Sequence, residues 1–138
     1  MTTTKWTPPP NGHPCWINVF ATDVQRARTF YHSVFDWKFR DSTTRMDGTE
    51  EDPTKIVHFS FGDGCPGGGI TKVDQVVKTN GKGGVVLYLM VDDLEGAMKK
   101  IVDAGGKKVT EVEPEGKFAL TQNFEDTEGN YFGLYQIK

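Results

Sequence analysis

The chain has 138 residues, of which 36% are hydrophobic and 25% charged, so its length and composition are those of one ordinary globular domain. A formal net charge of −3 indicates no basic surface for nucleic acid, and no apolar run is long enough to span a bilayer. We therefore expect neither nucleic acid nor a membrane as a partner. The two cysteines, Cys15 and Cys65, are too few for a disulfide framework, which favours a cytoplasmic protein with free thiols.

The first half of the chain is predicted to contain a tail, a strand, a helix and three further strands. Residues 1–14 are polar and rich in proline, as expected of a tail. Residues 16–21 alternate in character with a period of two, which predicts a strand. Asp23 is typical of a helix N-cap, and apolar residues then recur at helical spacing until Asp36 can take a left-handed backbone conformation. The next strands are expected at residues 38–40, 56–61 and 69–73.

The second half repeats this order after a glycine-rich linker at residues 74–84. A strand at residues 86–91 leads into a helix at residues 94–104, with Asp92 and Asp93 as caps and Gly105-Gly106 as the stop. Further strands are expected at residues 107–112, 118–124 and 131–137, with turns at residues 113–117 and 126–130.

The two halves share one pattern of elements. Asp23 aligns with Asp93, 70 positions later, and strand, turn and helix follow in the same order on both sides of the linker. The repeat predicts an α+β fold of two tandem βαβββ modules. Module one spans residues 15–73, the linker residues 74–84 and module two residues 85–138.

Several segments resemble the glyoxalase/bleomycin-resistance/extradiol-dioxygenase (vicinal oxygen chelate) family. Ala21–Tyr31 is similar to its first strand–helix corner, and Val34–Trp37 to the end of that helix, with Asp36 where the family usually has glycine. Val91–Leu94 with Gly105-Gly106 is similar to the start of the second module, and Asp126–Asn130 to the final hairpin turn. The resemblance implies two modules that form a cup-shaped, mostly antiparallel sheet around the site. It also implies a homodimer, by analogy only.

The resemblance further implies where a metal ion would bind. In metal-dependent members, His, Glu or Gln ligands lie on the cup-facing side of the first and last strands of each module. The matching positions here are Trp16, Val86, Gly133 and a fourth near Gly69 or Ile70. None of these side chains is a metal ligand, so we predict that the usual metal site is lost and that no cofactor is bound.

Strand alternation and the resemblance together place one set of side chains on the cup-facing side. The expected ligand-binding residues are Trp16, Asn18, Phe20, His58, Tyr88, Met90, Tyr131 and Tyr135. Such a set suits a flat, partly aromatic organic molecule held by stacking. The alternative, equally weighted, is that these side chains fill the cup as a second core.

The candidates for acid–base chemistry are His58, Tyr88 and Tyr135. A lone histidine in a strand is more often a hydrogen-bonded structural residue, and we favour that interpretation for His58. Cys65 is interpreted as an inert thiol in a glycine-rich hairpin loop. Glu125, Asp126 and Glu128 are interpreted as turn residues and not as a catalytic pair.

Three functions are compatible with these patterns. The first is a metal-free small-molecule binder, like the drug-sequestering members of the family. The second is a lyase, an isomerase or a dioxygenase-like enzyme, either metal-dependent or using a tyrosine or histidine as acid and base. The third is an interaction protein with a filled cup. Vacant ligand positions and the aromatic residues favour the first.

Overall fold

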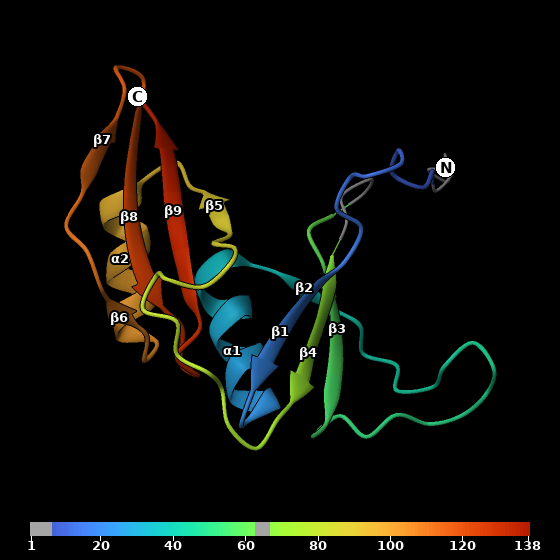
Figure 1. Cartoon of the computed structure of the whole chain (residues 1–138). Helices are drawn as coiled ribbons and strands as arrows, with labels where there is room; N and C mark the ends of the chain where they lie inside the picture. Colours follow the sequence, from blue (N-terminus) through green and yellow to red (C-terminus); the bar gives the residue numbers. More distant parts are fainter. Residues whose placement is uncertain (1–6, 63–66) are drawn as a thin grey trace. The chain divides into compact units, whose positions relative to one another are not determined.

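The structure, a computed structural model, describes residues 7–62 and 67–138. Cys65 and the first six residues of the predicted tail therefore lie outside the described residues. The chain divides into two compact units, Met1–Asp74 (unit 1) and Gln75–Lys138 (unit 2). Each unit contains one helix and its own sheet (Figure 1). Within the described residues, neither helix is long and apolar enough to cross a membrane.

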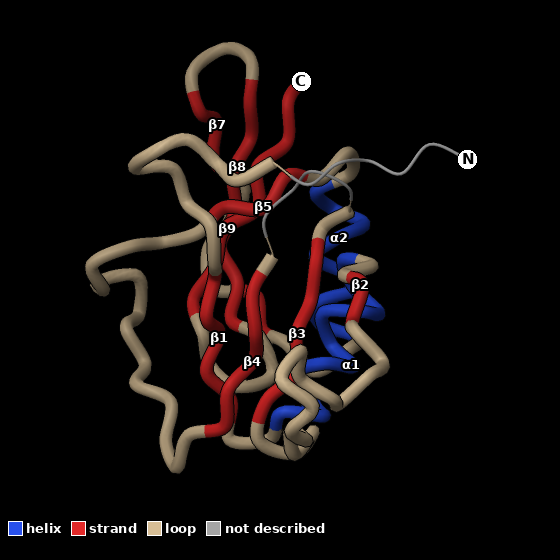
Figure 2. The backbone as a smooth tube through the Cα atoms, turned by 90° about the vertical axis from the view of Figure 1, so that its right-hand side faces the viewer, coloured by secondary structure: helices blue, strands red, loops and turns tan. Residues whose placement is uncertain are grey.

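Unit 1 is a four-stranded sheet with one helix. Its elements are β1 (Ile17–Ala21), α1 (Val24–Phe35), β2 (Lys38–Phe39), β3 (Ile56–Ser60) and β4 (Gly68–Lys72). The strand order is β1-β4-β3-β2, in which β1 and β4 are parallel and the other neighbours antiparallel. Figure 2 shows β2 beside β3, before the chain leaves the sheet for the long segment that leads back into β3. These elements confirm the predicted βαβββ order of module one.

Helix α1 begins and ends at the predicted residues. The Asp23 carboxylate accepts a hydrogen bond from the Arg26 backbone N–H at 3.0 Å, which satisfies one of the free donors of the first turn. Asp36 ends the helix in the left-handed conformation with φ of 58°, and its N–H donates to the His32 carbonyl at 3.0 Å. Val24, Ala27, Phe30 and Tyr31 are buried on one side of the helix, as their spacing predicts.

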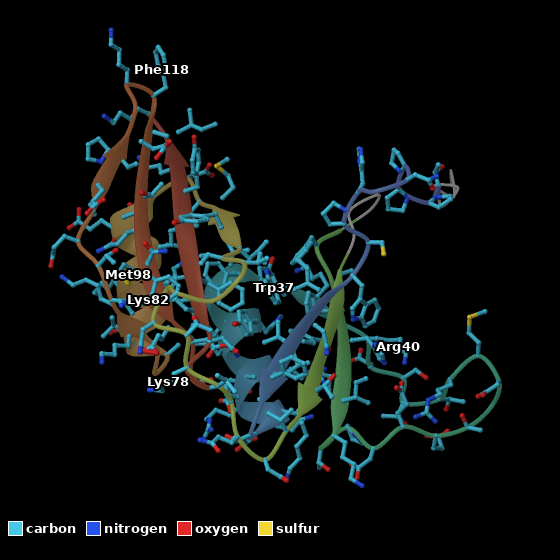
Figure 3. All side chains as sticks on the ribbon, viewed as in Figure 1. Trp37, Arg40, Lys78, Lys82, Met98 and Phe118 are labelled. Carbon is cyan, nitrogen blue, oxygen red and sulfur yellow. The ribbon has the colours of Figure 1, made fainter. Side chains whose placement is uncertain are left out.

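The core of unit 1 is built around a stack of three aromatic rings. Trp37, labelled in Figure 3, lies between Tyr31 and Phe59, with ring centroids 4.3 Å away on each side. Tyr31 comes from α1 and Phe59 from β3, so the stack joins the helix to the sheet. Burial of these large rings supplies much of the apolar area that unit 1 removes from water.

Unit 2 is a five-stranded sheet with one helix. Its elements are β5 (Tyr88–Met90), α2 (Leu94–Asp103), β6 (Lys107–Lys108), β7 (Glu113–Glu115), β8 (Ala119–Glu125) and β9 (Tyr131–Ile137). The strand order is β5-β9-β8-β6, with β7 also paired to β8. As in unit 1, the first strand pairs in parallel with the last, and the remaining pairs are antiparallel.

The structure corrects three predicted boundaries in unit 2, the first being that the strand expected at residues 86–91 spans only Tyr88–Met90. The strand expected at residues 107–112 stops at Lys108, and the turn expected at residues 113–117 contains strand β7. The cause is a bulge opposite Asn123: the Val109 and Thr110 N–H groups both donate to the Asn123 carbonyl, so pairing with β8 is interrupted and then resumes. Pro114 is tolerated in β7 because this strand pairs on one side only.

The turns that flank α2 and precede β9 follow the predicted chemistry. Asp93, rather than Asp92, caps α2 by accepting from the Gly96 N–H at 3.0 Å. Gly105 follows the helix with a φ of 100°, a conformation that glycine adopts without steric cost. Asp126 accepts from the N–H groups of Glu128 and Asn130, both at 2.8 Å, which confirms its role as a turn residue.

Candidate functional site

Each sheet has one buried face and one open face. In unit 1, Val19, Val57, Phe59 and Ile70 are buried on the side of α1. In unit 2, Leu134, Phe124 and Phe132 are buried on the side of α2. Because side chains alternate along a strand, the residues between these point to the opposite face. The residues predicted to bind a ligand all lie on these open faces.

The open face of unit 1 contains Trp16, Asn18, Phe20 and His58. Trp16 is 52% exposed and Phe20 44% exposed, although each adjoins a strand residue that faces the core. Asn18 in β1, Gly69 in β4 and His58 in β3 form one row across the sheet. The Thr71 hydroxyl donates to the Asn18 side-chain oxygen at 2.9 Å, and the Trp16 ring meets the His58 ring edge-on at 5.7 Å.

The open face of unit 2 contains Tyr88, Met90, Tyr131 and Tyr135. Tyr88 is 46% exposed and Met90 61% exposed. Tyr88 belongs to a row with Gly133 and Asn123, and the Asn123 amide donates to the Tyr88 hydroxyl at 3.4 Å. Burial, with smaller contributions from neighbouring Tyr88 and Glu125, raises the pKa of the Tyr131 hydroxyl. Tyr131 therefore stays protonated at neutral pH and can donate a hydrogen bond.

A glycine lies at the centre of the equivalent row in each unit. A Cβ atom placed on Gly133 would lie 2.2 Å from Cε2 of Tyr88, so the tyrosine ring occupies the space where a side chain at position 133 would begin. A Cβ atom on Gly69 would lie 3.1 Å from Cζ2 of Trp16. Both glycines are thus covered by an aromatic ring.

These glycines bear on the metal site that the family resemblance implies. Gly69, Gly133 and Trp16 offer no side-chain nitrogen or oxygen of the kind that binds a divalent ion, and Tyr88 already covers Gly133. Among the described residues, no group of three His, Cys, Asp or Glu side chains lies close enough to share an ion. The residues present at these positions do not fit the usual metal centre of the family.

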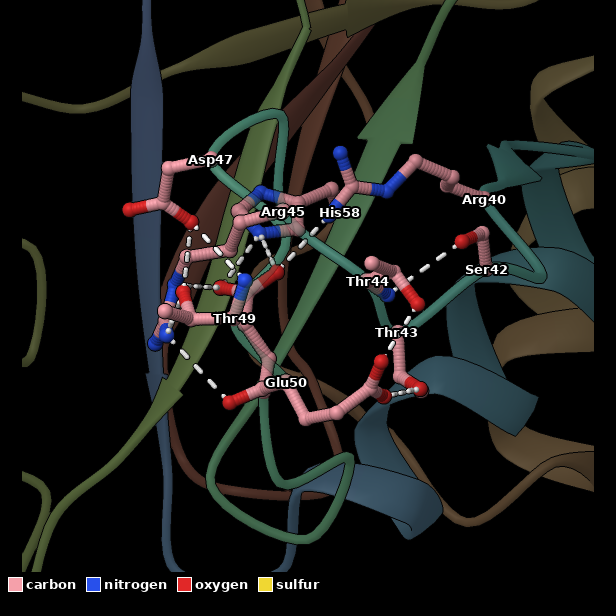
Figure 4. A network of polar contacts seen from close by, with 10 residues as sticks. Arg40, Ser42, Thr43, Thr44, Arg45, Asp47, Thr49, Glu50 and His58 are labelled. Carbon is pink, nitrogen blue, oxygen red and sulfur yellow. Dashed lines mark hydrogen bonds and ion pairs between the residues drawn. The ribbon is translucent and has the colours of Figure 1, made fainter.

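A polar cluster centred on Glu51 adjoins the open face of unit 1. Figure 4 labels its members Arg40, Arg45 and His58. Arg40 Nη2 donates to Glu51 Oε1 at 2.7 Å, and Arg45 Nε lies 3.6 Å from Oε2. Nε2 of His58 is 3.0 Å from both carboxylate oxygens. The Glu51 side chain is only 8% exposed. Glu51 and His58 line a cavity of about 320 Å³ together with Arg28, Arg40 and Thr43. His58 is therefore hydrogen-bonded, as predicted, but its partner is a carboxylate.

The electrostatics of this cluster favour an ionised Glu51. The hydrogen bond from His58 is the main cause that lowers the pKa of the Glu51 carboxyl, and the charges of His58, Arg45 and Arg40 lower it further. A carboxyl whose folded pKa lies below its unfolded value stabilises the fold above the unfolded pKa. That stabilisation is lost as the pH falls through the folded pKa.

Glu51→Gln is therefore expected to make the stability of the protein less dependent on pH in the acid range. In the wild type, the free energy of unfolding should decline as the pH drops below about 4.5, the ordinary Glu value. The glutamine variant lacks this titration and should decline less steeply. Urea unfolding at stepped pH values measures both slopes, with Glu113→Gln, an exposed residue of β7, as the control. Equal slopes for the wild type and Glu51→Gln would contradict the lowered pKa of Glu51 in the folded protein.

Sequence reasoning missed Glu51, Arg40, Arg45 and Asn123. The sequence pattern could have identified Asn123, because the alternation of residues 118–124 places Asn123 on the same face as Thr121. Glu51 carried no signal, since it lies in an irregular segment between β2 and β3 and meets His58 only through the fold. The Arg45 side chain comes from the same irregular segment.

Comparisons with known proteins agree with this architecture. A family model described as Glyoxalase/Bleomycin resistance protein/Dioxygenase superfamily matches residues 14–134. A glyoxylase-like domain-containing protein from Didymella fabae is 34% identical over 122 residues, covering 87% of this chain and 90% of that protein.

Solved structures share the fold at low identity. A glyoxalase/bleomycin resistance protein/dioxygenase family enzyme from Burkholderia phytofirmans matches with a TM-score of 0.67 and 14% identity, over 89% of this chain and 97% of that one. The fosfomycin resistance protein FosX from Mesorhizobium loti matches with a TM-score of 0.65 and 13% identity, over 91% and 92%. With the family match across most of the chain, the protein belongs to the glyoxalase/bleomycin resistance protein/dioxygenase superfamily.

Proposed function

We propose that the protein binds a small, planar, partly aromatic organic molecule on the open faces of its sheets, without the usual metal centre of the family. The observation that supports this most is the exposure of Trp16, Phe20, Tyr88 and Met90 on the open faces of sheets whose opposite faces hold the buried core residues. A planar ligand stacked on such side chains removes apolar surface from water. Asn18, Tyr88 and Tyr135 offer hydrogen bonds to orient it.

A second candidate is an enzyme of the lyase, isomerase or dioxygenase-like kind. The pairing of His58 with Glu51 favours it, because a histidine oriented by a carboxylate is a common arrangement for proton transfer. In this candidate His58, rather than Tyr88 or Tyr135, moves the proton. Among the described residues, neither Tyr88 nor Tyr135 has such a carboxylate partner, and the Asn123 amide donates to the Tyr88 oxygen.

The test is a titration with 4-nitroanisole, a planar aromatic probe that has no ionisable proton, followed by NMR of the backbone amides. Binding is expected to shift amides of β1 and β4 in unit 1, or of β5 and β9 in unit 2, which identifies the face used. Trp16→Ser or Tyr88→Ser, on the face that binds, should weaken affinity by about three- to tenfold, the contribution of one stacking contact.

The control is Phe118→Ser. Phe118 is 75% exposed, but it lies at the β7–β8 turn, away from the open face of its sheet (Figure 3). Affinity should not change in this variant. No shift in either sheet, or an equal loss of affinity in Phe118→Ser, would contradict the proposed binding function.

A further inference from the structure

The hydrogen bond between His58 and Glu51 determines which ring nitrogen carries the proton. An ionised carboxylate only accepts hydrogen bonds, and Nε2 lies 3.0 Å from both Oε1 and Oε2 of Glu51. Nε2 must therefore donate, so in the neutral ring Nδ1 has a free lone pair. The carboxylate thus makes Nδ1 the basic atom of His58.

The surroundings of Glu51 keep this arrangement in place. Among the described residues, the guanidinium groups of Arg40 and Arg45 lie within ion-pair distance of the Glu51 carboxylate, and Arg28 and Asp41 line the same cavity. The guanidinium groups of Arg40 and Arg45 hold Glu51 in its ionised, accepting form.

Nδ1 of His58 lies beside the Trp16 ring and is accessible to solvent. A Cβ atom on Gly69 would lie 3.8 Å from Nδ1 of His58 and 3.1 Å from Cζ2 of Trp16, so the two rings lie next to each other above this glycine. No described residue donates a hydrogen bond to Nδ1. Since every buried side-chain polar atom in the described part of the chain has a partner, Nδ1 is accessible to solvent.

We infer that His58 and Glu51 form a proton-accepting site for a planar aromatic ligand that carries an acidic hydroxyl, such as a phenol or an enol. This inference rests on the proposed binding function and names its ligand class. The ligand ring stacks on Trp16, and its hydroxyl donates to Nδ1 of His58, whose ring centre is 5.7 Å from that of Trp16. On full transfer the ligand O–H bond breaks, an N–H bond forms at Nδ1, and the phenolate or enolate pairs with the imidazolium. No oxidant or reductant is needed.

The first experiment needs no ligand. Long-range nitrogen–proton NMR distinguishes the two neutral forms of each histidine, and His58 is expected to carry its proton on Nε2. His32 is an internal control with the opposite expectation, because its Nδ1 lies 3.1 Å from the Trp37 carbonyl oxygen and must donate to it. Glu51→Gln should shift His58 toward a mixture of the two forms. A proton on Nδ1 of neutral His58 in the wild type would overturn the inference.

The second experiment compares 4-nitrophenol with 4-nitroanisole, its methyl ether. The wild type is expected to bind 4-nitrophenol about tenfold more tightly than 4-nitroanisole. A hydrogen bond with ionic character contributes an affinity gain of this order. The absorption of the bound phenol should change to that of nitrophenolate at a lower pH than in free solution. His58→Phe keeps an aromatic ring beside Trp16 and should abolish both effects, Glu51→Gln should reduce them, and His32→Phe should leave them unchanged.

The outcomes separate this inference from the function on which it rests. Equal affinity for the two probes, or an unchanged preference in His58→Phe, would overturn the inference while leaving small-molecule binding intact. Binding of neither probe would overturn both. Should His58→Phe fail to fold, Glu51→Gln and the protonation state of His58 decide the matter.

Discussion

Replacing Trp37 with alanine is expected to lower the free energy of unfolding by about 3–5 kcal/mol, the usual cost of removing a large aromatic side chain from a packed core. Trp37 is 4% exposed and stacks on Tyr31 and on Phe59 at 4.3 Å each. Its loss leaves a cavity between α1 and β3 and removes both stacking contacts. Urea unfolding followed by far-UV circular dichroism measures the change without relying on tryptophan fluorescence.

The matched control is Trp16→Ala, which removes the same side chain from an exposed position. Trp16 is half exposed on the open face of unit 1, so less buried area is lost than at Trp37, and the loss of stability should be clearly smaller than in Trp37→Ala. Similar losses in the two variants would show that Trp16 is part of a core. That result would favour the interpretation in which the predicted ligand-binding residues fill a second core.

Gly68→Ala is expected to cost about 3 kcal/mol or more, at the upper end for overpacking. A Cβ atom on Gly68 would lie 1.7 Å from the carbonyl oxygen of Ile17 and 2.7 Å from its carbon. These are backbone atoms of the paired strand β1 and cannot rotate away, so β1 and β4 must separate. Thermal unfolding gives the loss of stability, and amide hydrogen exchange should show reduced protection in β1 and β4.

Gly84→Ala is the control for the effect of adding a methyl group to a glycine. A Cβ atom on Gly84 would meet no heavy atom within 4 Å, and its φ is not in the left-handed region. The substitution should be neutral or slightly stabilising, because it restricts the unfolded chain. If Gly68→Ala were as stable as Gly84→Ala, the close approach of β1 and β4 would be disproved.

The fold could be predicted largely because its elements have local signals. Asp23 and Asp93 cap the two helices through their own backbone neighbours, and Asp36 and Gly105 end them with positive φ. The errors arose where pairing depends on a distant strand. Strand β5 begins at Tyr88 rather than Val86, and the bulge opposite Asn123 that divides β6 from β7 has no signal within residues 107–117.

The candidate site was predicted in part. Strand parity grouped Trp16, Asn18 and Phe20 on one face, and Tyr88 and Met90 on another, and the structure has both groups on open faces. Strand parity could not identify Glu51, because Glu51 contacts His58 only in the folded chain. Binding of a small molecule, the homodimer and the cytoplasmic location stay predictions.

By itself, the sequence determined the family, the duplicated βαβββ order and the side of each strand that faces its helix, since periodicity and capping act over a few residues. Only the tertiary structure decided what the exposed side chains meet. The carboxylate that sets the protonation of His58 comes from an irregular segment, and the rings that cover Gly69 and Gly133 come from Trp16, just before β1, and from Tyr88 in β5. Such contacts depend on the path of the whole chain, which local propensity does not encode.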